Sequence, residues 1–380
     1  MERIPLAFEQ LGFKLKPIVL IGPGENVPED LPDEDMLLGY RYNYREDAFT
    51  VNFKVNFSSR RRSARICPDL LEDSELEGMK FTPASLLSLQ ASQYDPLGFA
   101  TPFLAKGKIL LSEVHKVTPG WKEWLVPEHQ ARAMDYAREI LSLVRNPVRF
   151  RRHIIGEGFA LHSLFCFVDA SSVALSCVIY ALTKHEEGDI DTSFVCAKNA
   201  LTRRSVPQNE LAAIVAGNRL LHNYLLACES ETLKEVIVLS DSECCLAQLK
   251  PEFSPSDVYT RNKVSECHRL HSRMTVPQYY YHIPSKRNSP ADSGTRADTK
   301  AEYLRSNEWQ FGPQFIKDIH NFSEARLFQV IPPNSEMSQQ PSFNVDANVA
   351  DVQEVPPHPL LLLLDRCGTL TQAVRVVCWV

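Results

Sequence analysis

The sequence predicts an α/β fold in which a mixed five-stranded sheet carries helices on its faces, preceded by a smaller α+β region. Two observations predict the sheet. Three strand-like apolar runs follow one another after residue 155, and helix-like and strand-like segments alternate after residue 207. Strands joined by hairpins pair antiparallel, whereas strands separated by helices can pair in parallel. A chain that does both is expected to form a mixed sheet.

The elements of this sheet follow in a definite order. They are strands at 163–168, 173–182 and 192–198, a helix at 207–227, a strand at 235–240, helices at 243–249 and 257–273, a strand at 276–284, and a helix opening at 289–296. The first of these helices places Leu211, Ile214, Leu221 and Leu225 on one face, as a helix packed on a sheet requires.

The region before the sheet combines a strand with helices. Residues 48–57 alternate apolar and polar side chains, which predicts a half-buried strand. Thr82-Pro83 is typical of a helix start, with Pro at the first helical position. Residues 128–144 repeat apolar side chains near every 3.6 positions, which predicts a second long helix ending at Asn146-Pro147.

The composition is that of a globular protein. The 380 residues are 44% hydrophobic and 23% charged, with a net charge of −6, which excludes a polycation of the histone kind. No apolar run is long enough for a membrane helix, and the first residues lack the apolar core of a signal peptide. The ten cysteines include no CxxC pair and no zinc spacing. We expect a reducing, cytoplasmic location and no membrane partner.

Four carboxylates stand at informative positions. Asp169 and Asp241 each end an apolar strand, Glu210 lies in the first turn of the helix after Pro207, and Asp292 lies at a helix start. Taken singly, each is more often a turn, cap or first-turn residue. Because all four fit one order of strands and helices, and neighbouring strand ends open onto a common crevice, we expect them to lie close together.

Such a cluster needs a counter-charge. Four carboxylates at short range raise one another's pKa values, and divalent cations relieve that repulsion. Mg²⁺ prefers hard oxygen ligands, and two such ions can activate a water and stabilise the leaving oxygen of a phosphodiester. The residues alone therefore predict metal-dependent phosphodiester chemistry, with Mg²⁺ or Mn²⁺ as the cofactor.

Several motifs of the chain resemble those of BEL/Pao-type retrotransposon polyproteins. Tyr94-Asp95-Pro96-Leu97-Gly98-Phe99 is similar to a segment that follows the reverse transcriptase palm, and Leu38-Gly39-Tyr40-Arg41-Tyr42 resembles the end of that palm. Four further motifs resemble the RNase H-like part of these polyproteins. They are Phe167-Val168-Asp169-Ala170-Ser171, Pro207-Gln208-Asn209-Glu210-Leu211, Leu239-Ser240-Asp241-Ser242 and Asn288-Ser289-Pro290-Ala291-Asp292 with Thr295-Arg296.

The resemblance implies an RNase H-like endonuclease that cuts RNA in RNA–DNA hybrids by a two-metal mechanism. The four carboxylates would then be both catalytic residues and ligands of two Mg²⁺ or Mn²⁺ ions. The expected partners are the hybrid and the missing reverse transcriptase and integrase parts of the polyprotein, in the cytoplasm or in a virus-like particle. Basic residues expected to hold the nucleic acid are Lys198, Arg203, Arg204, Lys286, Arg287 and Arg296.

The same resemblance divides the chain. We expect a remnant of the palm end at 1–80, a helical thumb or connection-like region at 81–154, an RNase H-like domain at 155–305, a trailing segment at 306–330, a linker at 331–364, and the start of a pre-integrase helix at 365–380. The chain departs from the family pattern in two respects. It has no Tyr-x-Asp-Asp motif, so no DNA synthesis is expected, and Ser285 stands where cellular RNases H place a His.

Two other functions are compatible with the residues. A truncated element could leave a catalytically silent nucleic-acid-binding remnant. Alternatively, Asp292-Ser293-Gly294 matches the Asp-Ser/Thr-Gly motif of aspartic peptidases. That motif needs an apolar strand leading into the Asp, and here the preceding residues are polar and contain Pro290. The peptidase is therefore the minor alternative.

Overall fold

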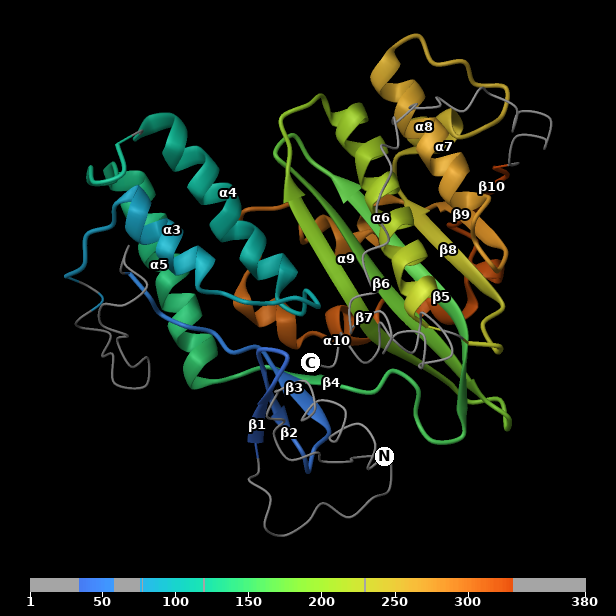
Figure 1. The fold of residues 1–380 in the computed structure, drawn as a ribbon, viewed down its shortest axis with the longest axis horizontal. Coiled ribbons are helices and arrows are strands. Elements are labelled where there is room, and N and C mark those ends of the chain that lie inside the picture. The colour runs from blue at the N-terminus through green and yellow to red at the C-terminus, as the bar shows by residue number, and fades with distance from the viewer. Residues whose placement is uncertain (1–33, 58–75, 77, 119, 229, 331–380) are drawn as a thin grey trace, which may run out of the picture.

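A computed structural model describes residues 34–57, 76, 78–118, 120–228 and 230–330. The predicted linker, the predicted pre-integrase helix, residues 1–33 and most of 58–77 lie outside these described residues. Figure 1 shows a large twisted sheet, a group of helices beside it, and a small sheet below both. Within the described residues, every helix is too short or too polar to span a bilayer.

The small sheet and the helical group are built from the N-terminal part of the chain. The antiparallel small sheet has the order β1-β2-β3-β4. Its strands are β1 (Glu34–Leu37), β2 (Tyr40–Asn43), β3 (Ala48–Thr50) and β4 (Arg149–Arg151), and the helices are α3 (Pro83–Ala91), α4 (Thr101–Val117) and α5 (Pro127–Arg145). Strand β4, which follows the three helices in the chain, pairs with β3, which precedes them, so the small sheet joins both ends of the helical group.

The large sheet has the order β10-β9-β8-β5-β6-β7. Strand β5 pairs antiparallel with β6 and parallel with β8, so the sheet is mixed, as predicted. Its strands are β5 (Phe159–Ala170), β6 (Ala174–His185), β7 (Ile190–Leu201), β8 (Glu235–Ser240), β9 (Gln278–His282) and β10 (Arg326–Phe328). The five predicted strands are all present, and β10 adds a sixth by pairing antiparallel with β9.

Helices cover both faces of this sheet. Helices α6 and α8 lie on the front face in Figure 1, and α9 and α10 lie behind it. The helices and 3₁₀ helices of this part are α6 (Val206–Ala227), α7 (Glu243–Gln248), α8 (Val258–His271), η2 (Ser285–Arg287), α9 (Ser289–Asp292), η3 (Ala301–Arg305), α10 (Asn307–Phe311) and η4 (Gln314–Asn321).

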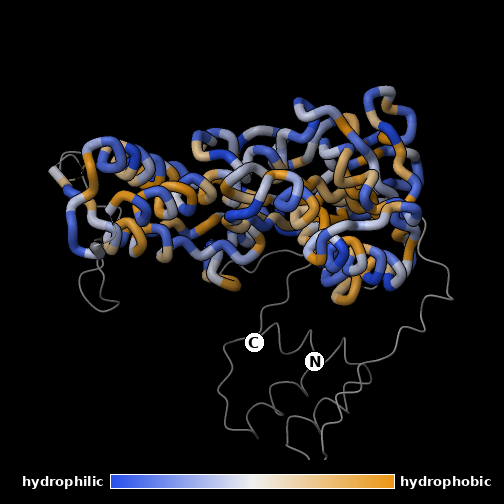
Figure 2. Tube along the Cα trace, turned by 90° about the horizontal axis from the view of Figure 1, so that it is seen from above, coloured by the Kyte–Doolittle hydropathy of each residue, from blue (hydrophilic) through white to orange (hydrophobic). Residues whose placement is uncertain are grey.

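Strand β5 separates two hydrophobic cores. Leu164, Cys166 and Val168 point into the core under α6, whereas Phe165 and Phe167 point into the core on the opposite face. The second core continues into the helical group and the small sheet, so the described parts share one apolar interior. Figure 2 shows the same arrangement, with hydrophobic positions gathered inside one elongated body.

The predicted trailing segment belongs to this interior. Trp309 is fully buried, and its indole Nε1 donates to the carbonyl oxygen of Phe99 at 2.7 Å. Its ring also lies 5.2 Å from that of Phe194 on β7. Through Trp309, α10 thus contacts both the segment that leads into α4 and the edge strand of the large sheet.

The segment Tyr94–Gly98 joins these same two parts. The carbonyl oxygen of Leu97 accepts a hydrogen bond from the backbone of Ala197 on the edge strand β7 at 2.9 Å. Gly98 has φ +81°, and a Cβ added there would lie 2.0 Å from the Ala197 carbonyl oxygen. Only glycine allows both that backbone conformation and that close approach.

Candidate metal centre

Two of the predicted carboxylates come from neighbouring parallel strands. Asp169 is the second-to-last residue of β5 and is only 6% exposed, and Asp241 directly follows β8. The two strands pair in parallel, with Phe167 opposite Leu239. Because parallel strands end at the same edge of a sheet, both side chains reach one crevice.

The third carboxylate comes from the helix that covers these strands. Helix α6 starts at Val206, so Glu210 is its fifth residue, just after the first turn. The preceding residue fixes the start of the helix, because the amide of Asn209 donates to the carbonyl oxygens of Ser171 at 2.9 Å and Arg204 at 3.1 Å. Asn209 therefore ties the helix to the end of β5.

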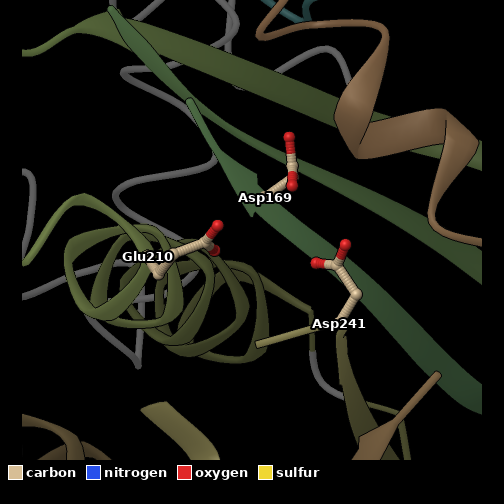
Figure 3. A group of neighbouring side chains, drawn as sticks. All are labelled: Asp169, Glu210 and Asp241. Carbon is tan, nitrogen blue, oxygen red and sulfur yellow. The ribbon is translucent and has the colours of Figure 1, made fainter. Parts of the chain in front are cut away.

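The three side chains converge. One carboxylate oxygen from each of Asp169, Glu210 and Asp241 lies within 4.8 Å of the other two. Figure 3 shows the three carboxylates pointing from a strand end, a helix and a second strand end toward one shared space. The predicted approach of these residues, which are far apart in the chain, is therefore observed.

The protein environment disfavours the charged forms of this cluster. Burial, and then the charges of Asp169 and Asp241, raise the pKa of Glu210 from 4.5 to about 8. Burial also raises the pKa of Asp169 from 3.8 to about 6, with further contributions from Asp241 and Asp292, while a hydrogen bond from Thr295 opposes the rise. A cation bound among these oxygens would relieve the same repulsion.

The donor set fits a divalent cation of the Mg²⁺ or Mn²⁺ type. All three side chains offer hard oxygen ligands, and Glu210 Oε2 is buried without a hydrogen-bond partner among the described residues. A buried carboxylate oxygen that lacks a donor carries a free-energy cost, which coordination to a cation would remove.

Three residues outside the predicted set of site residues support the cluster. The amide of Asn288, fully buried, donates to the Val168 carbonyl oxygen at 2.9 Å and to Asp241 Oδ1 at 3.1 Å. The hydroxyl of Thr295 donates to Asp169 Oδ2 at 2.7 Å, and that of Ser285 donates to Asp241 Oδ2. All three lie in or just before the Asn288–Arg296 motif. The resemblance of this motif to the RNase H-like part of BEL/Pao-type polyproteins was the sequence feature that could have pointed to them.

Asp292 is placed differently from the other three. It is the last residue of α9, and its Oδ2 accepts a charged hydrogen bond from Nε of Arg296, four residues later. Its carboxylate is outside the group of oxygens that lie within 4.8 Å of one another. The predicted four-residue site is therefore a three-residue cluster with the fourth carboxylate held beside it by an arginine.

The predicted basic residues fall into two groups. Lys198 on β7 and Arg203 and Arg204 in the following loop are exposed near the start of α6, and the Arg204 guanidinium lies 4.1 Å from the centre of the Tyr259 ring. The other group is already paired.

Lys286 and Arg287 both form ion pairs with Glu324, at 3.5 Å and 2.6 Å. Arg296 is bound to Asp292. The first group is therefore free of carboxylate partners among the described residues, whereas the second would have to exchange a partner to bind a phosphate.

The structure also bears on the peptidase alternative. Asp292 ends a short helix, and Ser293 and Gly294 after it are buried. An aspartic peptidase motif needs its Asp at the end of an apolar strand that can pair with a second copy. That arrangement is absent at Asp292.

Strands β5, β6 and β7 form an antiparallel meander, and β8 and β9 extend the sheet in parallel from β5. The domain is therefore a mixed α/β fold with a candidate metal site where β5 and β8 end. Residues 82–242 match the family described as the Pao retrotransposon-like RNaseH-like domain. This is the family that the sequence motifs resemble, so the match confirms the resemblance for these residues. It begins at the helical group, whose packing on β7 makes it part of the same body.

The structure is similar to several solved structures at low identity. RNase H1 from the halophilic archaeon Halobacterium salinarum NRC-1 has 16% identity and a TM-score of 0.26, over 38% of this chain and 98% of that one. LC11-RNase H1 in complex with RNA/DNA hybrid has 14% identity and a TM-score of 0.24, over 38% and 99%. The foamy viral protease-reverse transcriptase in complex with dsDNA has 14% identity and a TM-score of 0.21, over 66% and 45%. None of the curated proteins matches the chain.

Proposed function

We propose that this chain is a metal-dependent endonuclease that hydrolyses the RNA strand of RNA–DNA hybrids. The observation that carries the proposal is the convergence of Asp169, Glu210 and Asp241 from three separate elements, with an unpartnered buried oxygen on Glu210. Buried carboxylates with strongly raised pKa values are characteristic of functional sites, since a purely structural carboxylate is normally paired.

Each residue has a distinct part in this function. Asp169 on β5, Glu210 on α6 and Asp241 after β8 would hold the cations. Bound ions would supply an activated water and charge stabilisation at the phosphodiester. The protein itself fixes the ligands in place, through Asn288 on Asp241 and Thr295 on Asp169.

The surroundings of the site support a polyanionic substrate. Lys198, Arg203 and Arg204 are exposed at the edge that carries the acidic cluster, where they can contact backbone phosphates without first losing a carboxylate partner among the described residues. We further propose that the chain is part of a retrotransposon polyprotein, with reverse transcriptase and integrase parts as its partners, and that it acts in the cytoplasm or in a virus-like particle.

The test is hydrolysis of a hybrid whose RNA strand is end-labelled, in Mg²⁺ and in Mn²⁺. We expect cleavage by the wild type and at least about a 100-fold loss in Asp241→Asn, because the amide keeps the shape and removes the negative ligand. The matched control is Asp189→Asn, an exposed Asp in the β6–β7 turn at the opposite end of the sheet. Equal rates for wild type and Asp241→Asn would contradict the proposal.

A further inference from the structure

The ion pair between Asp292 and Arg296 lies directly beside the acidic cluster. Thr295, between them in the chain, donates its hydroxyl to Asp169 Oδ2 at 2.7 Å and lies 2.9 Å from the Asp292 carbonyl oxygen. The segment that carries Asp292 is thus attached to the central carboxylate of the cluster. The Asp292 side chain nevertheless accepts from Arg296 and not from any group of the cluster.

The backbone of this segment is held against the large sheet, so the Asp292 and Arg296 side chains can change partners without moving the backbone. The amide of Asn199 on β7 donates to the Gly294 carbonyl oxygen at 3.3 Å, and the Ser171 hydroxyl donates to that of Thr295 at 3.2 Å. A Cβ at Gly294 would lie 2.3 Å from the Ser176 hydroxyl, which shows how closely the backbone approaches β6. Asp292 therefore stays beside the cluster whichever partner its side chain has.

The pair is also easy to separate. The side chains of Arg296 and Asp292 are 60% and 34% exposed, and ion pairs in such positions contribute little net stability. The contrast is Lys106 with Glu139, whose side chains are 11% and 17% exposed. Water can replace either partner of the Asp292 pair at low cost, whereas the buried pair cannot open without leaving a charge unsolvated.

We propose that Arg296 is a displaceable counter-charge that keeps Asp292 from binding a cation until a polyanion draws the arginine away. Without nucleic acid, the site binds one divalent ion among Asp169, Glu210 and Asp241. A second ion binds well only when the Arg296 guanidinium turns from Asp292 to a phosphate of the bound backbone. Arg296 is thus a positioning residue that acts through Asp292, and the inference rests on the proposed metal-dependent function.

The test is a Mn²⁺ titration of the full chain without nucleic acid, followed by calorimetry and by electron paramagnetic resonance. The wild type should bind one ion tightly and a second at least about tenfold more weakly. Arg296→Gln should tighten the second site by about five- to tenfold and leave the first unchanged, since it removes a weak surface pair and a nearby positive charge. Arg296→Lys, which keeps the charge but not the planar guanidinium, should fall between the two.

The matched control is Arg219→Gln, because Arg219 on α6 is nearly as exposed as Arg296, at 56% against 60%, and pairs with Glu266 away from the cluster. It should bind both ions as the wild type does. Thermal melting in EDTA verifies that each variant is folded. A hybrid with a 2′-O-methyl RNA strand should tighten the second site of the wild type and have little effect on that of Arg296→Gln.

The outcomes separate this inference from the proposed function. An unchanged or weakened second site in Arg296→Gln would overturn the role of Arg296 while leaving the metal site intact. Asp169→Asn serves as the reference for the site itself, and it should abolish the first ion. If the wild type binds Mn²⁺ no better than Asp169→Asn, the metal site fails, and the proposed function fails with it.

Discussion

Carboxylates are buried in two regions of this protein, and the two regions differ in how many hydrogen bonds those carboxylates accept. At the junction of the small sheet and the helical group, Asp95 accepts four hydrogen bonds. The donors are the Tyr40 hydroxyl at 2.7 Å and the backbone N–H groups of Gly98 at 3.1 Å, Phe99 at 3.0 Å and Ala100 at 2.7 Å. At the sheet edge, Asp169 has one side-chain donor, Thr295, and Glu210 Oε2 has none among the described residues.

The difference separates a structural carboxylate from the cluster that we propose to be functional. Donors around Asp95 use its lone pairs and fix the start of α4, so its function is complete in the folded protein. In the cluster, by contrast, carboxylate oxygens lack hydrogen-bond donors and three negative groups lie close together. Both features lower the stability of the fold. Unused acceptors near one another are what a cation requires, so the destabilised region is the one expected to bind a ligand.

The largest expected effect on stability comes from breaking the satisfied region. Asp95→Ala should lower the free energy of unfolding by about 3 kcal/mol, because several enclosed donors lose their acceptor at once. Denaturant unfolding of the metal-free protein measures this. Asp135→Ala is the control, since that exposed Asp on α5 is paired only weakly with Arg138, at 3.5 Å, and should cost less than about 0.5 kcal/mol. A loss at Asp95 no larger than that at Asp135 would refute the structural role.

In the cluster we expect a substitution to raise the free energy of unfolding. Glu210→Gln should raise the stability of the metal-free protein at pH 8 by about 1–2 kcal/mol, after allowance for solvent screening, because it removes a charge that burial and two neighbouring Asp residues disfavour. The same variant should lose most of the rise in melting temperature that Mn²⁺ gives the wild type. A destabilised Glu210→Gln would mean that the cluster is not under repulsion.

The pH dependence of stability should reflect the raised pKa values in the cluster. The pKa of Glu210 rises from 4.5 to about 8 on folding and that of Asp169 from 3.8 to about 6. Both groups therefore hold protons more tightly when folded, and their contribution to stability is present at low pH and is lost as pH rises through this window.

Melting of the metal-free wild type between pH 4.5 and 8 should show this decline, and Glu210→Gln should show a smaller one. Mn²⁺ should stabilise the wild type more at pH 8 than at pH 5.5, because its ligands must be deprotonated. Equal stabilisation at the two pH values would argue against carboxylate ligands.

The three carboxylates of the cluster could be predicted from the sequence, because each lies at the end or start of a segment with a clear apolar pattern. Asp169 and Asp241 were found because each ends a strongly apolar strand, and Glu210 because it opens a helix of clear periodicity. The sixth strand was missed, since three residues at 326–328 carry no periodic signal and pair only because β9 offers them an edge. Periodicity near 48–57 was correct for burial, yet only Ala48–Thr50 pair as a strand.

The long-range hydrogen bonds of the cluster could not be predicted from the sequence. Nothing local indicates that Asn288 bonds Asp241, 47 residues away, or that Thr295 bonds Asp169 across 126 residues. The pairing of Asp292 with Arg296 was equally hidden, although its four-residue spacing allows it. Which carboxylates share a cation depends on such contacts, and therefore on the tertiary structure.

The smallest expected effect comes from Thr295→Val, which keeps the shape of the side chain and removes the hydroxyl that donates to Asp169. We expect a loss of about 1 kcal/mol in metal-free stability, because a buried acceptor loses its partner. Mn²⁺ affinity should fall about tenfold, as is usual when the group that orients a metal ligand is removed. Ser293→Ala should leave that affinity unchanged, because the Ser293 hydroxyl donates to the Pro290 carbonyl oxygen in the same segment and not to Asp169. If both variants bind Mn²⁺ alike, Thr295 stabilises the segment without orienting Asp169, and the two regions differ less than the geometry indicates.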